Sequence, residues 1–395
     1  MSIDVLLDFA HAHRDDDPVR LLLQQTRYPG IDLSLVAQQL EGQRQASVKW
    51  PTLADCPRYF YPPRLNREQS SSEAAAQYKA SLARQWEVGT VADLTGGMGI
   101  DSLFLARVTD SLDYCERDGM LCDIARHNFA ALGQGNIQCH ACDSMAWLEQ
   151  QPMRYDLIYI DPARRDSQGR KVAAFEDCTP DLPGHLALLR SRCRRLLVKA
   201  SPMIDLHAAV GQLGSVAEVH IVAVRGECKE VLFVLDSQTM DVPGSGDPVI
   251  HCVNLPDDEA VTFTWAEEAA AQPRFAAAMG TYLYEPHAAL MKGGCYQLLS
   301  KQYDVAQLSR NTHLYTSDQW IAGFPGRRFR VLQELTPTPK AAAAAIPGRK
   351  AHVVTRNYPL AAADLQRRLR LTEGGSLFVI AATLGSTPKV WLCEK

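Results

Sequence analysis

Long apolar runs are missing from this sequence of 395 residues. No stretch approaches the ~18 uninterrupted apolar residues that a membrane-spanning helix needs, which argues against an integral membrane protein. The first residues, from Met1 to Asp8, carry acids where a secretory signal carries lysines. We therefore expect a cytoplasmic protein that has no membrane partner.

Paired cysteines are also scarce. Among the eleven cysteines, Cys139 and Cys142 form a lone C-x-x-C, and no second pair has the spacing that a four-ligand zinc site needs. We therefore expect no metal and predict buried free thiols. Metal or redox use of this pair is the alternative.

The composition is 46% hydrophobic and 22% charged, as in ordinary globular proteins, and the length predicts two to four domains. Charge is distributed unevenly along the chain. Residues 275–395 hold 15 Lys and Arg against 7 Asp and Glu, whereas the remainder holds 26 against 38. A basic C-terminal third on an acidic body favours docking of a nucleic acid, and a merely solvated basic surface is the alternative.

Three kinds of pattern divide the chain. Helical spacing of apolar residues between 2 and 47, an irregular proline-rich connector from Trp50 to Arg67 and a helix from Ser72 to Trp86 predict an N-terminal helical region, 1–85. A boundary rich in Pro, Gly and Ser spans 240–248. Beyond it we expect two small α+β domains, 249–322 and 323–395.

Between them, short apolar strands alternate with helices, which predicts a doubly wound, mostly parallel α/β sheet of the Rossmann-like kind over residues 86–240. The last two strands are joined by Arg225–Glu230, which is too short for a helical crossover, so the final strand should be antiparallel. The seven predicted strands are Thr90–Leu94, Ser111–Glu116, Asn136–Ala141, Tyr155–Ile160, Arg195–Lys199, Ala217–Val224 and Val231–Asp236.

The strongest chemical signal is the segment from Val91 to Asp101, VADLTGGMGID. An apolar strand ends in Asp93, and a glycine-rich turn then enters a helix whose first N–H groups are unpaired. A dinucleotide site would show G-x-G-x-x-G for a pyrophosphate. An acid before the glycines repels phosphate and can pair with the ammonium of a methionine group, so we prefer S-adenosylmethionine to NAD; a glycine turn without a ligand is the alternative. The predicted contacts are Asp93, Thr95, Gly96, Gly97, Gly99 and Asp101.

Two further acids end the next strands. Glu116, followed by Arg117, lies about twenty residues beyond the first motif, where one carboxylate can accept both hydroxyls of a ribose. Asp143, followed by Ser144, ends the third strand at the expected adenine position. We assign these four residues to the cofactor site. An ordinary surface glutamate and a simple helix cap at Asp143 are the alternatives.

The segment YDLIYIDPARRD brings Asp161 and Pro162 to the carboxyl end of a buried strand, where open α/β sheets place reactive groups. It resembles the Asp/Asn-Pro-Pro motif of class I methyltransferases that modify nucleic-acid bases. The resemblance implies that Asp161 orients the substrate nitrogen and that Pro162 keeps the loop rigid. This sequence departs from the motif at Ala163 and Arg164, so a flipped base would lack its aromatic stacking partner.

Arg164 resembles the arginine of the uracil-5 methyltransferases, and we include it in the predicted catalytic set. Those enzymes carry a cysteine nucleophile on the next strand, whereas this chain has Ser201 there. We therefore predict direct transfer to a nucleophilic nitrogen, which needs only orientation and proximity. Nearby cations suggest phosphate or base contacts, with a solvated charge run as the alternative. They are Arg164, Arg165, Arg170 and Lys171.

Several further segments together resemble one family. Combined with Asp93–Gly97, they look like the bacterial class I methyltransferases that carry a ferredoxin-like domain and a C-terminal THUMP-like domain, and the resemblance extends from about residue 69 to near the end. It implies a doubly wound catalytic domain and, because true THUMP domains bind RNA, an RNA substrate. The segments are Gln69–Ala80, Leu283–Lys292, Asn311–Ser317 and Thr355–Leu360. A purely structural role for the last of them is the alternative.

Cations and aromatics are interleaved in the C-terminal part, which suits phosphate contacts and stacking on unpaired bases. The alternative places the aromatics in the core of their own domain. The cations are Arg327, Arg328, Arg330, Arg349, Lys350, Arg356, Arg367, Arg368 and Arg370, and the aromatics are Tyr315, Trp320, Phe324, Phe329 and Tyr358.

The sequence thus predicts an S-adenosylmethionine-dependent RNA methyltransferase that acts on a base nitrogen, with the guanine exocyclic amine favoured. One alternative is a methyltransferase of DNA, protein or a small molecule. The other is an RNA-binding or assembly factor that no longer turns over.

Overall fold

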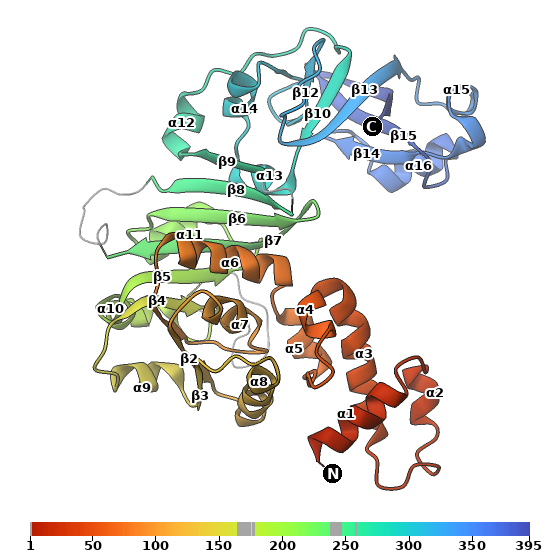
Figure 1. Ribbon diagram of the computed structural model, residues 1–395. Helices are drawn as coiled ribbons and strands as arrows, with labels where there is room; N and C mark the ends of the chain where they lie inside the picture. The colour runs from red at the N-terminus through yellow and green to blue at the C-terminus, as the bar shows by residue number, and fades with distance from the viewer. Residues whose placement is uncertain (1, 164–174, 176–177, 238–246, 257–258) are drawn as a thin grey trace. The chain divides into compact units, whose positions relative to one another are not determined.

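A computed structural model describes residues 2–163, 175, 178–237, 247–256 and 259–395 (Figure 1). The chain forms two compact units. Unit 1 comprises Met1–Val219 and Lys229–Gly246, and unit 2 comprises His220–Cys228 and Asp247–Lys395. Within the described ranges, no helix is both long and apolar enough to cross a membrane.

Unit 1 begins with helices whose starts are marked by capping residues. The Asp17 carboxylate caps α2, with Pro18 in its first turn, and the Ser72 hydroxyl caps α6. The prediction of an irregular connector is wrong in part, because a short helix begins at Pro51. Proline is tolerated in the first turn of a helix, since the N–H groups there have no acceptor within the helix. The helices are α1 (Ile3–Ala12), α2 (Pro18–Leu22), α3 (Leu33–Lys49), α4 (Pro51–Ala54), α5 (Arg64–Gln69) and α6 (Glu73–Gln85).

The rest of unit 1 is the predicted doubly wound α/β sheet. Its strands lie in the order β3-β2-β1-β4-β5-β7, with the first five parallel and β7 antiparallel to β5, as predicted. The strands are β1 (Thr90–Asp93), β2 (Ser111–Glu116), β3 (Ile137–Ala141), β4 (Tyr155–Ile160), β5 (Cys193–Ala200) and β7 (Glu227–Asp236). The strand between the last two along the chain, β6 (Glu218–Val224), begins in unit 1, and most of it belongs to unit 2. The helices between them are α7 (Ile100–Ala106), α8 (Gly119–Ala131), α9 (Ser144–Glu149), α10 (Leu182–Arg192) and α11 (Leu206–Leu213).

The strand order places a topological switch point at β1 and β4. The chain winds from β1 outward to β3 and then returns to β4 on the other side of β1. In open α/β sheets, ligands bind at the carboxyl ends of the strands beside such a switch point. Asp93 ends β1, and Asp161 directly follows β4. The fold therefore brings two of the predicted site acids to the same sheet edge.

Unit 2 contains a seven-stranded sheet in the order β11-β12-β10-β13-β16-β15-β14. Its pairs are antiparallel except β14 and β15, which are parallel and are connected through α16. The sheet is buried on both faces, because Val379 and Ala381 pack in one core and Ile380 and Ala382 in the other.

Two more strands and several short helices complete unit 2. Its strands are β8 (Val249–Leu255), β9 (Glu259–Phe263), β10 (Tyr282–Pro286), β11 (Ala306–Gln307), β12 (Tyr315–Ser317), β13 (Gly326–Glu334), β14 (His352–Arg356), β15 (Leu377–Leu384) and β16 (Thr387–Glu394). Its helices are α12 (Trp265–Ala270), α13 (Ala288–Gly293), α14 (Gln297–Gln302), α15 (Pro339–Ala345), the 3-10 helix η2 (Pro347–Arg349) and α16 (Ala362–Leu369).

Candidate active site

The loop between β1 and α7 is organised by Asp93. One of its carboxylate oxygens accepts a hydrogen bond from the Thr95 N–H (3.0 Å) and the other from the Ser102 hydroxyl (2.5 Å). Only 1% of Asp93 is exposed. Burial raises the pKa of Asp93 to about 7, although both hydrogen bonds oppose this. Asp93 therefore lies beneath the loop and ties its beginning to the first turn of α7.

Glycines in this loop are required by close contacts. A Cβ atom on Gly96 would lie 2.1 Å from the Tyr114 ring, and one on Gly99 would lie 2.7 Å from the Phe129 ring. Gly97 and Gly99 also have φ values of 55° and 81°, which favour glycine. The loop backbone is therefore packed directly on two aromatic rings, and a side chain would displace it.

Glu116 connects the glycine loop to the end of β2. Its carboxylate accepts hydrogen bonds from the Gly97 N–H (2.9 Å) and from the Asp118 N–H (2.8 Å). The side chain is half-buried, and the following Arg117 is exposed. The structure thus brings Glu116 to the glycine loop.

Asp143 lies at the start of α9 and caps it. Its Oδ1 accepts hydrogen bonds from the N–H groups of Met145 (3.1 Å) and Ala146 (3.0 Å). Ser144 is the first residue of the helix. Asp143 therefore acts as the N-cap of α9, which is the alternative given for it above.

Asp161 lies next to the glycine loop at the end of β4. Its backbone N–H donates to the Thr95 hydroxyl (2.6 Å), and its Oδ2 forms an ion pair with the Lys199 ammonium. Pro162 is buried behind it. Thr95 thus joins the two motifs that the sequence indicated separately. The predicted site residue Arg164 lies outside the described residues, as do Arg165, Arg170 and Lys171.

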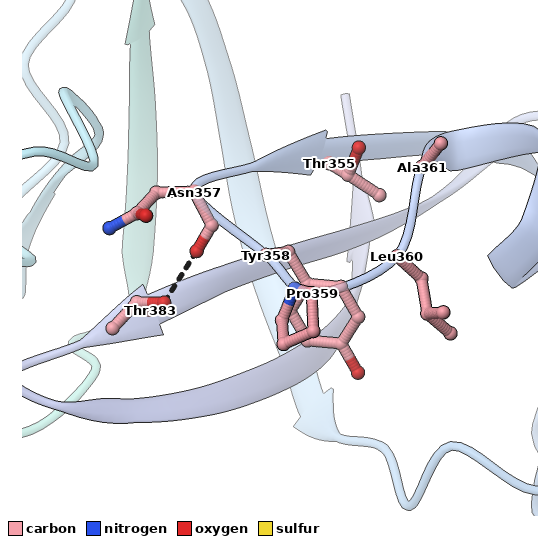
Figure 2. Close-up of a pocket in the computed structure, with 7 residues that line it drawn as sticks. All are labelled: Thr355, Asn357, Tyr358, Pro359, Leu360, Ala361 and Thr383. Carbon is pink, nitrogen blue, oxygen red and sulfur yellow. Dashed lines mark hydrogen bonds between the residues drawn. The ribbon is translucent and has the colours of Figure 1, made fainter.

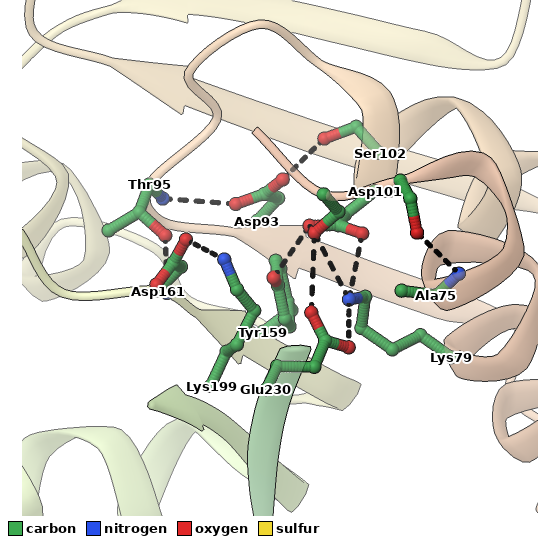
Figure 3. A network of polar contacts seen from close by, with 12 residues as sticks. Ala75, Lys79, Asp93, Thr95, Asp101, Ser102, Tyr159, Asp161, Lys199 and Glu230 are labelled. Carbon is green, nitrogen blue, oxygen red and sulfur yellow. Dashed lines mark hydrogen bonds and ion pairs between the residues drawn. The ribbon is translucent and has the colours of Figure 1, made fainter. Parts of the chain in front are cut away.

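Asp101 belongs to a buried polar network rather than to the loop surface (Figure 3). The ammonium of Lys79, which is fully buried, lies 3.1 Å from Asp101 and 2.5 Å from Glu230. The hydroxyls of Tyr159 and Ser71 donate to Asp101 at 2.7 and 2.8 Å. Asp101 therefore anchors α7 to α6 and β4 beneath the cofactor loop.

Acids outnumber cations in this region. Burial opposes ionisation of Asp101, but Lys79 and Lys199 outweigh burial and hold the pKa of Asp101 below its usual value. Among the described residues, three acids form ion pairs with two lysines here: Asp101, Asp161 and Glu230 with Lys79 and Lys199. Such a surplus of negative charge suits a cationic ligand such as a sulfonium with an ammonium group.

Sequence reasoning missed Lys79, Lys199 and Glu230. A signal was present for Lys199, which interrupts the apolar run Leu196–Val198 of a predicted buried strand. A lysine is almost never buried without a partner, so such a position predicts a nearby acid. The identity of that acid follows only from the strand order, which pairs β4 with β5.

The two thiols of the C-x-x-C pair are free. Burial raises the pKa of Cys139 to about 11, and burial also raises the pKa of Cys142 above its usual value. Both thiols are therefore protonated at neutral pH.

Three motifs of the C-terminal part meet in unit 2. The buried Glu285 carboxylate pairs with both Arg327 and Arg356. Asn357 has a left-handed φ of 47°, and its carbonyl accepts a hydrogen bond from the Thr383 hydroxyl (2.5 Å). Figure 2 shows the pocket that this turn lines. Arg356 and Asn357 thus make contacts within unit 2, and a purely structural role of Thr355–Asn357 stays the alternative.

Most of the C-terminal aromatics belong to the core of unit 2. Tyr315, Phe324 and Phe329 are fully buried, whereas Trp320 is 50% exposed and Tyr358 is half-buried. The core alternative therefore describes the first three. Trp320 and Tyr358 remain accessible for stacking.

Comparison with known proteins identifies the two domains at the C-terminal end and relatives of the chain. A model of a ferredoxin-like domain matches residues 282–325, and a model of a THUMP-like domain matches residues 326–395. An S-adenosylmethionine-dependent methyltransferase of Mycobacterium tuberculosis is 26% identical over 349 residues, which are 87% of this chain and 91% of that protein. The tRNA1(Val) (adenine(37)-N6)-methyltransferase of Cronobacter sakazakii is 36% identical over 80 residues, 19% of this chain and 33% of that enzyme.

A solved structure matches the whole chain. The crystal structure of a protein assigned as a methyltransferase, from Porphyromonas gingivalis W83, is 31% identical, covers 100% of this chain and 98% of its own, and has a TM-score of 0.88. The cofactor is S-adenosylmethionine, whose positive charge fits the acid surplus around the loop. The chain therefore belongs to the bacterial class I S-adenosylmethionine-dependent methyltransferases that carry a ferredoxin-like domain and a C-terminal THUMP-like domain.

Proposed function

We propose that this protein methylates a base nitrogen of RNA in the cytoplasm, with the exocyclic amine of guanine as the favoured acceptor. The observation that carries the proposal is the position of Asp161, which follows β4 and is joined to the glycine loop through Thr95. A carboxylate there can accept a hydrogen bond from an N–H group of the substrate. The THUMP-like domain and the partial similarity to a tRNA adenine-N6 methyltransferase favour RNA over other acceptors.

S-adenosylmethionine supplies an electrophilic methyl group on a sulfonium. We assign its binding to the predicted loop and strand-end residues. Asp93 accepts a hydrogen bond from the Thr95 N–H, and Glu116, which accepts one from the Gly97 N–H, would accept hydrogen bonds from the ribose hydroxyls. The loop set is Thr95, Gly96, Gly97 and Gly99, with Asp101 behind it, and the strand-end set is Glu116, Arg117, Asp143 and Ser144.

In direct transfer, the substrate nitrogen would form a bond to the methyl carbon while the carbon–sulfur bond breaks, S-adenosylhomocysteine would leave, and the methylated nitrogen would lose one proton to solvent. Asp161 accepts the hydrogen bond from that nitrogen and thereby aims its lone pair, and Pro162 restricts the backbone that carries the carboxylate. Arg164 would contact the phosphate or base beside it. No covalent enzyme intermediate is required, in keeping with Ser201 at the position of the uracil-5 enzymes' cysteine.

The docking surface for RNA is proposed to be the basic part of unit 2. Its arginines are presented on β13 and α16, and several are exposed, among them Arg330, Arg367 and Arg368. Arg328 lies over the exposed Trp320 ring, 5.9 Å from its centroid, which combines a cation with a stacking surface. This arrangement suits unpaired nucleotides.

Mass spectrometry of nucleosides tests the proposal. RNA from a deletion strain should lack one methylated nucleoside that wild-type cells contain, and a plasmid carrying the wild-type gene should restore it. A plasmid carrying Asp161→Ala should not, because orientation at the reacting nitrogen is lost. Total DNA and protein from the same strains serve as controls.

Each alternative predicts a different result. If the deletion strain lacks a methyl group on DNA or protein, and its RNA is unchanged, then DNA or protein is the substrate instead of RNA. Restoration of growth by Asp161→Ala, with no change in any methylated nucleoside, would identify an assembly factor instead of an enzyme.

A further inference from the structure

Lys199 is a charged residue in the middle of the buried sheet. It lies in β5 after Leu196, Leu197 and Val198, each of which is 0% exposed. An ammonium group in such surroundings is costly unless a partner of opposite charge compensates it. A buried ammonium group at this position therefore requires an acid as its partner.

The partner is Asp161. The Lys199 ammonium contacts Asp161 Oδ2, and the Lys199 side chain is 10% exposed against 35% for Asp161. Burial lowers the pKa of Lys199, but the charges of Asp161, Glu230 and Asp101 outweigh burial and raise it above its usual value. Lys199 is thus a cation at neutral pH, and it forms an ion pair with the predicted catalytic acid, Asp161 (Figure 3).

The neighbouring acids already have another lysine. Lys79 pairs with both Asp101 and Glu230, at 3.1 and 2.5 Å. The two lysines that are buried among the described residues thus form different ion pairs. Lys79 connects α6, α7 and β7, and Lys199 serves Asp161.

Asp161 is consequently held at two points. Its backbone N–H is bound by Thr95, and Oδ2 is bound by Lys199. Oδ1 has no hydrogen-bond partner among the described residues, and the side chain is partly exposed. One oxygen is thus bound by Lys199, whereas the other accepts no hydrogen bond from any residue that the structure describes.

We propose that Lys199 is a positioning residue for methyl transfer: its ammonium binds Oδ2 of Asp161 and fixes the carboxylate, so that Oδ1 is aimed at the substrate N–H. This inference rests on the proposed role of Asp161. It differs from a role in balancing buried charge, because a residue that acts through Asp161 has no further effect once Asp161 is neutralised.

A double-mutant cycle separates the two roles. The variants are Lys199→Met, Lys199→Arg, Asp161→Asn and the Lys199→Met/Asp161→Asn pair, assayed for transfer of labelled methyl to RNA from the deletion strain. Lys199→Met should lower kcat by roughly 10²-fold in the wild-type background, since misplacement at the reacting atom has costs of that order. In the Asp161→Asn background it should lower kcat by less than about threefold. Lys199→Arg should recover part of the activity, because it restores the charge.

Lys79→Met is the matched control, because it removes a buried lysine of the same network that does not contact Asp161. It should change kcat by the same factor in the wild-type and Asp161→Asn backgrounds. Binding of S-adenosylhomocysteine, measured by calorimetry, should change by less than about threefold in Lys199→Met. Equal loss of kcat in both backgrounds for Lys199→Met would overturn the proposal.

A measurement that needs no RNA tests the role of Lys199 independently of the proposed RNA substrate. Crystal structures of the wild type, Lys199→Arg and Lys199→Met with S-adenosylhomocysteine should show the Asp161 carboxylate in one place in the first two and displaced in the third. If the wild type transfers no methyl to RNA, the proposed function fails while these structures still decide the role of Lys199. An unmoved carboxylate in Lys199→Met would refute it.

Discussion

At the scale of single residues, Asp93 combines complete burial with two hydrogen bonds to its carboxylate. Burial raises the pKa of Asp93 to about 7, whereas an aspartate in an unfolded chain ionises near about pH 3.9. The folded protein therefore binds more protons than the unfolded chain between about pH 4 and pH 7. The contribution of Asp93 to stability falls as the pH rises through that window and is lowest above it.

Asp93→Asn should remove this dependence, because an amide does not ionise. The difference in the free energy of unfolding between the variant and the wild type should therefore rise by about 2–3 kcal/mol, in favour of the variant, from about pH 5 to about pH 8. Altered hydrogen bonds to Thr95 and Ser102 contribute equally at both pH values and cancel in the comparison. Urea unfolding of both proteins at the two pH values measures the difference, and a constant offset would contradict the assignment.

Cys193 provides the residue-scale test of direct transfer. Burial raises the pKa of its thiol to about 12, and the thiol donates to the Leu189 carbonyl. A protonated, buried thiol is not a nucleophile. Cys193→Ala and Cys178→Ala should therefore each keep kcat within about threefold of the wild type. A covalent adduct trapped on RNA that contains 5-fluoropyrimidine would exclude this mechanism.

At the scale of elements, the β1–α7 loop depends on contacts from neighbouring elements. Tyr114 of β2 packs under Gly96 and donates its hydroxyl to the Gly97 carbonyl (2.6 Å), and Phe129 of α8 packs against Gly99. These contacts are all supplied by the protein and fix the backbone of the loop. A fixed backbone lowers the cost of binding a ligand, since less backbone must be ordered.

Gly96→Ala should disrupt this arrangement. The added methyl group would overlap the Tyr114 ring, which should lower the free energy of unfolding by about 1–3 kcal/mol. It should also abolish measurable binding of S-adenosylhomocysteine in calorimetry. Gly119→Ala is the control: it lies in the first turn of α8, and its Cβ would meet no atom within 4 Å. A Gly96→Ala protein that binds normally would mean that the loop does not hold the cofactor.

Elements with a clear pattern were predictable, and contacts between distant elements were not. β2 and β4 have the predicted bounds, because each is an apolar run that ends beside an acid. The helix α11 was missed although Asp205 caps its start and Gly214 follows its end, and the strands β14 and β16 were missed as well. The buried network escaped prediction because Lys79, Lys199 and Glu230 come from three elements, and only the strand order brings them together.

At the scale of the molecule, four arginines of the C-terminal part belong to one sheet that also contains strands of the ferredoxin-like segment; they are Arg327, Arg328, Arg330 and Arg356. β13 pairs with β10 on one side and with β16 on the other. Deleting residues 323–395 would therefore expose the β10 edge and remove most of the sheet. Loss of RNA binding after such a deletion would report unfolding of unit 2, so charge reversal is the better test of docking.

Three arginines at the C-terminal end of α16 offer that test. Arg367, Arg368 and Arg370 are exposed, and Leu365 and Leu369 on the same helix are buried, so the core is left untouched by changes to the arginines. Reversing all three to Glu should weaken RNA binding roughly tenfold or more. It should also flatten the log–log salt dependence, because each lost phosphate contact removes roughly 0.7–0.9 from the slope.

The matched control reverses Arg14, Arg20 and Arg27, which are exposed in the N-terminal helical region and change the net charge by the same amount. If α16 docks RNA, the control should keep the wild-type slope, and its affinity should fall only through the general change in charge. Filter-binding titrations at several salt concentrations compare the two triple variants. Equal losses in both would show that long-range charge, rather than contact with α16, governs RNA binding, and the docking surface would then have to be sought elsewhere on the protein.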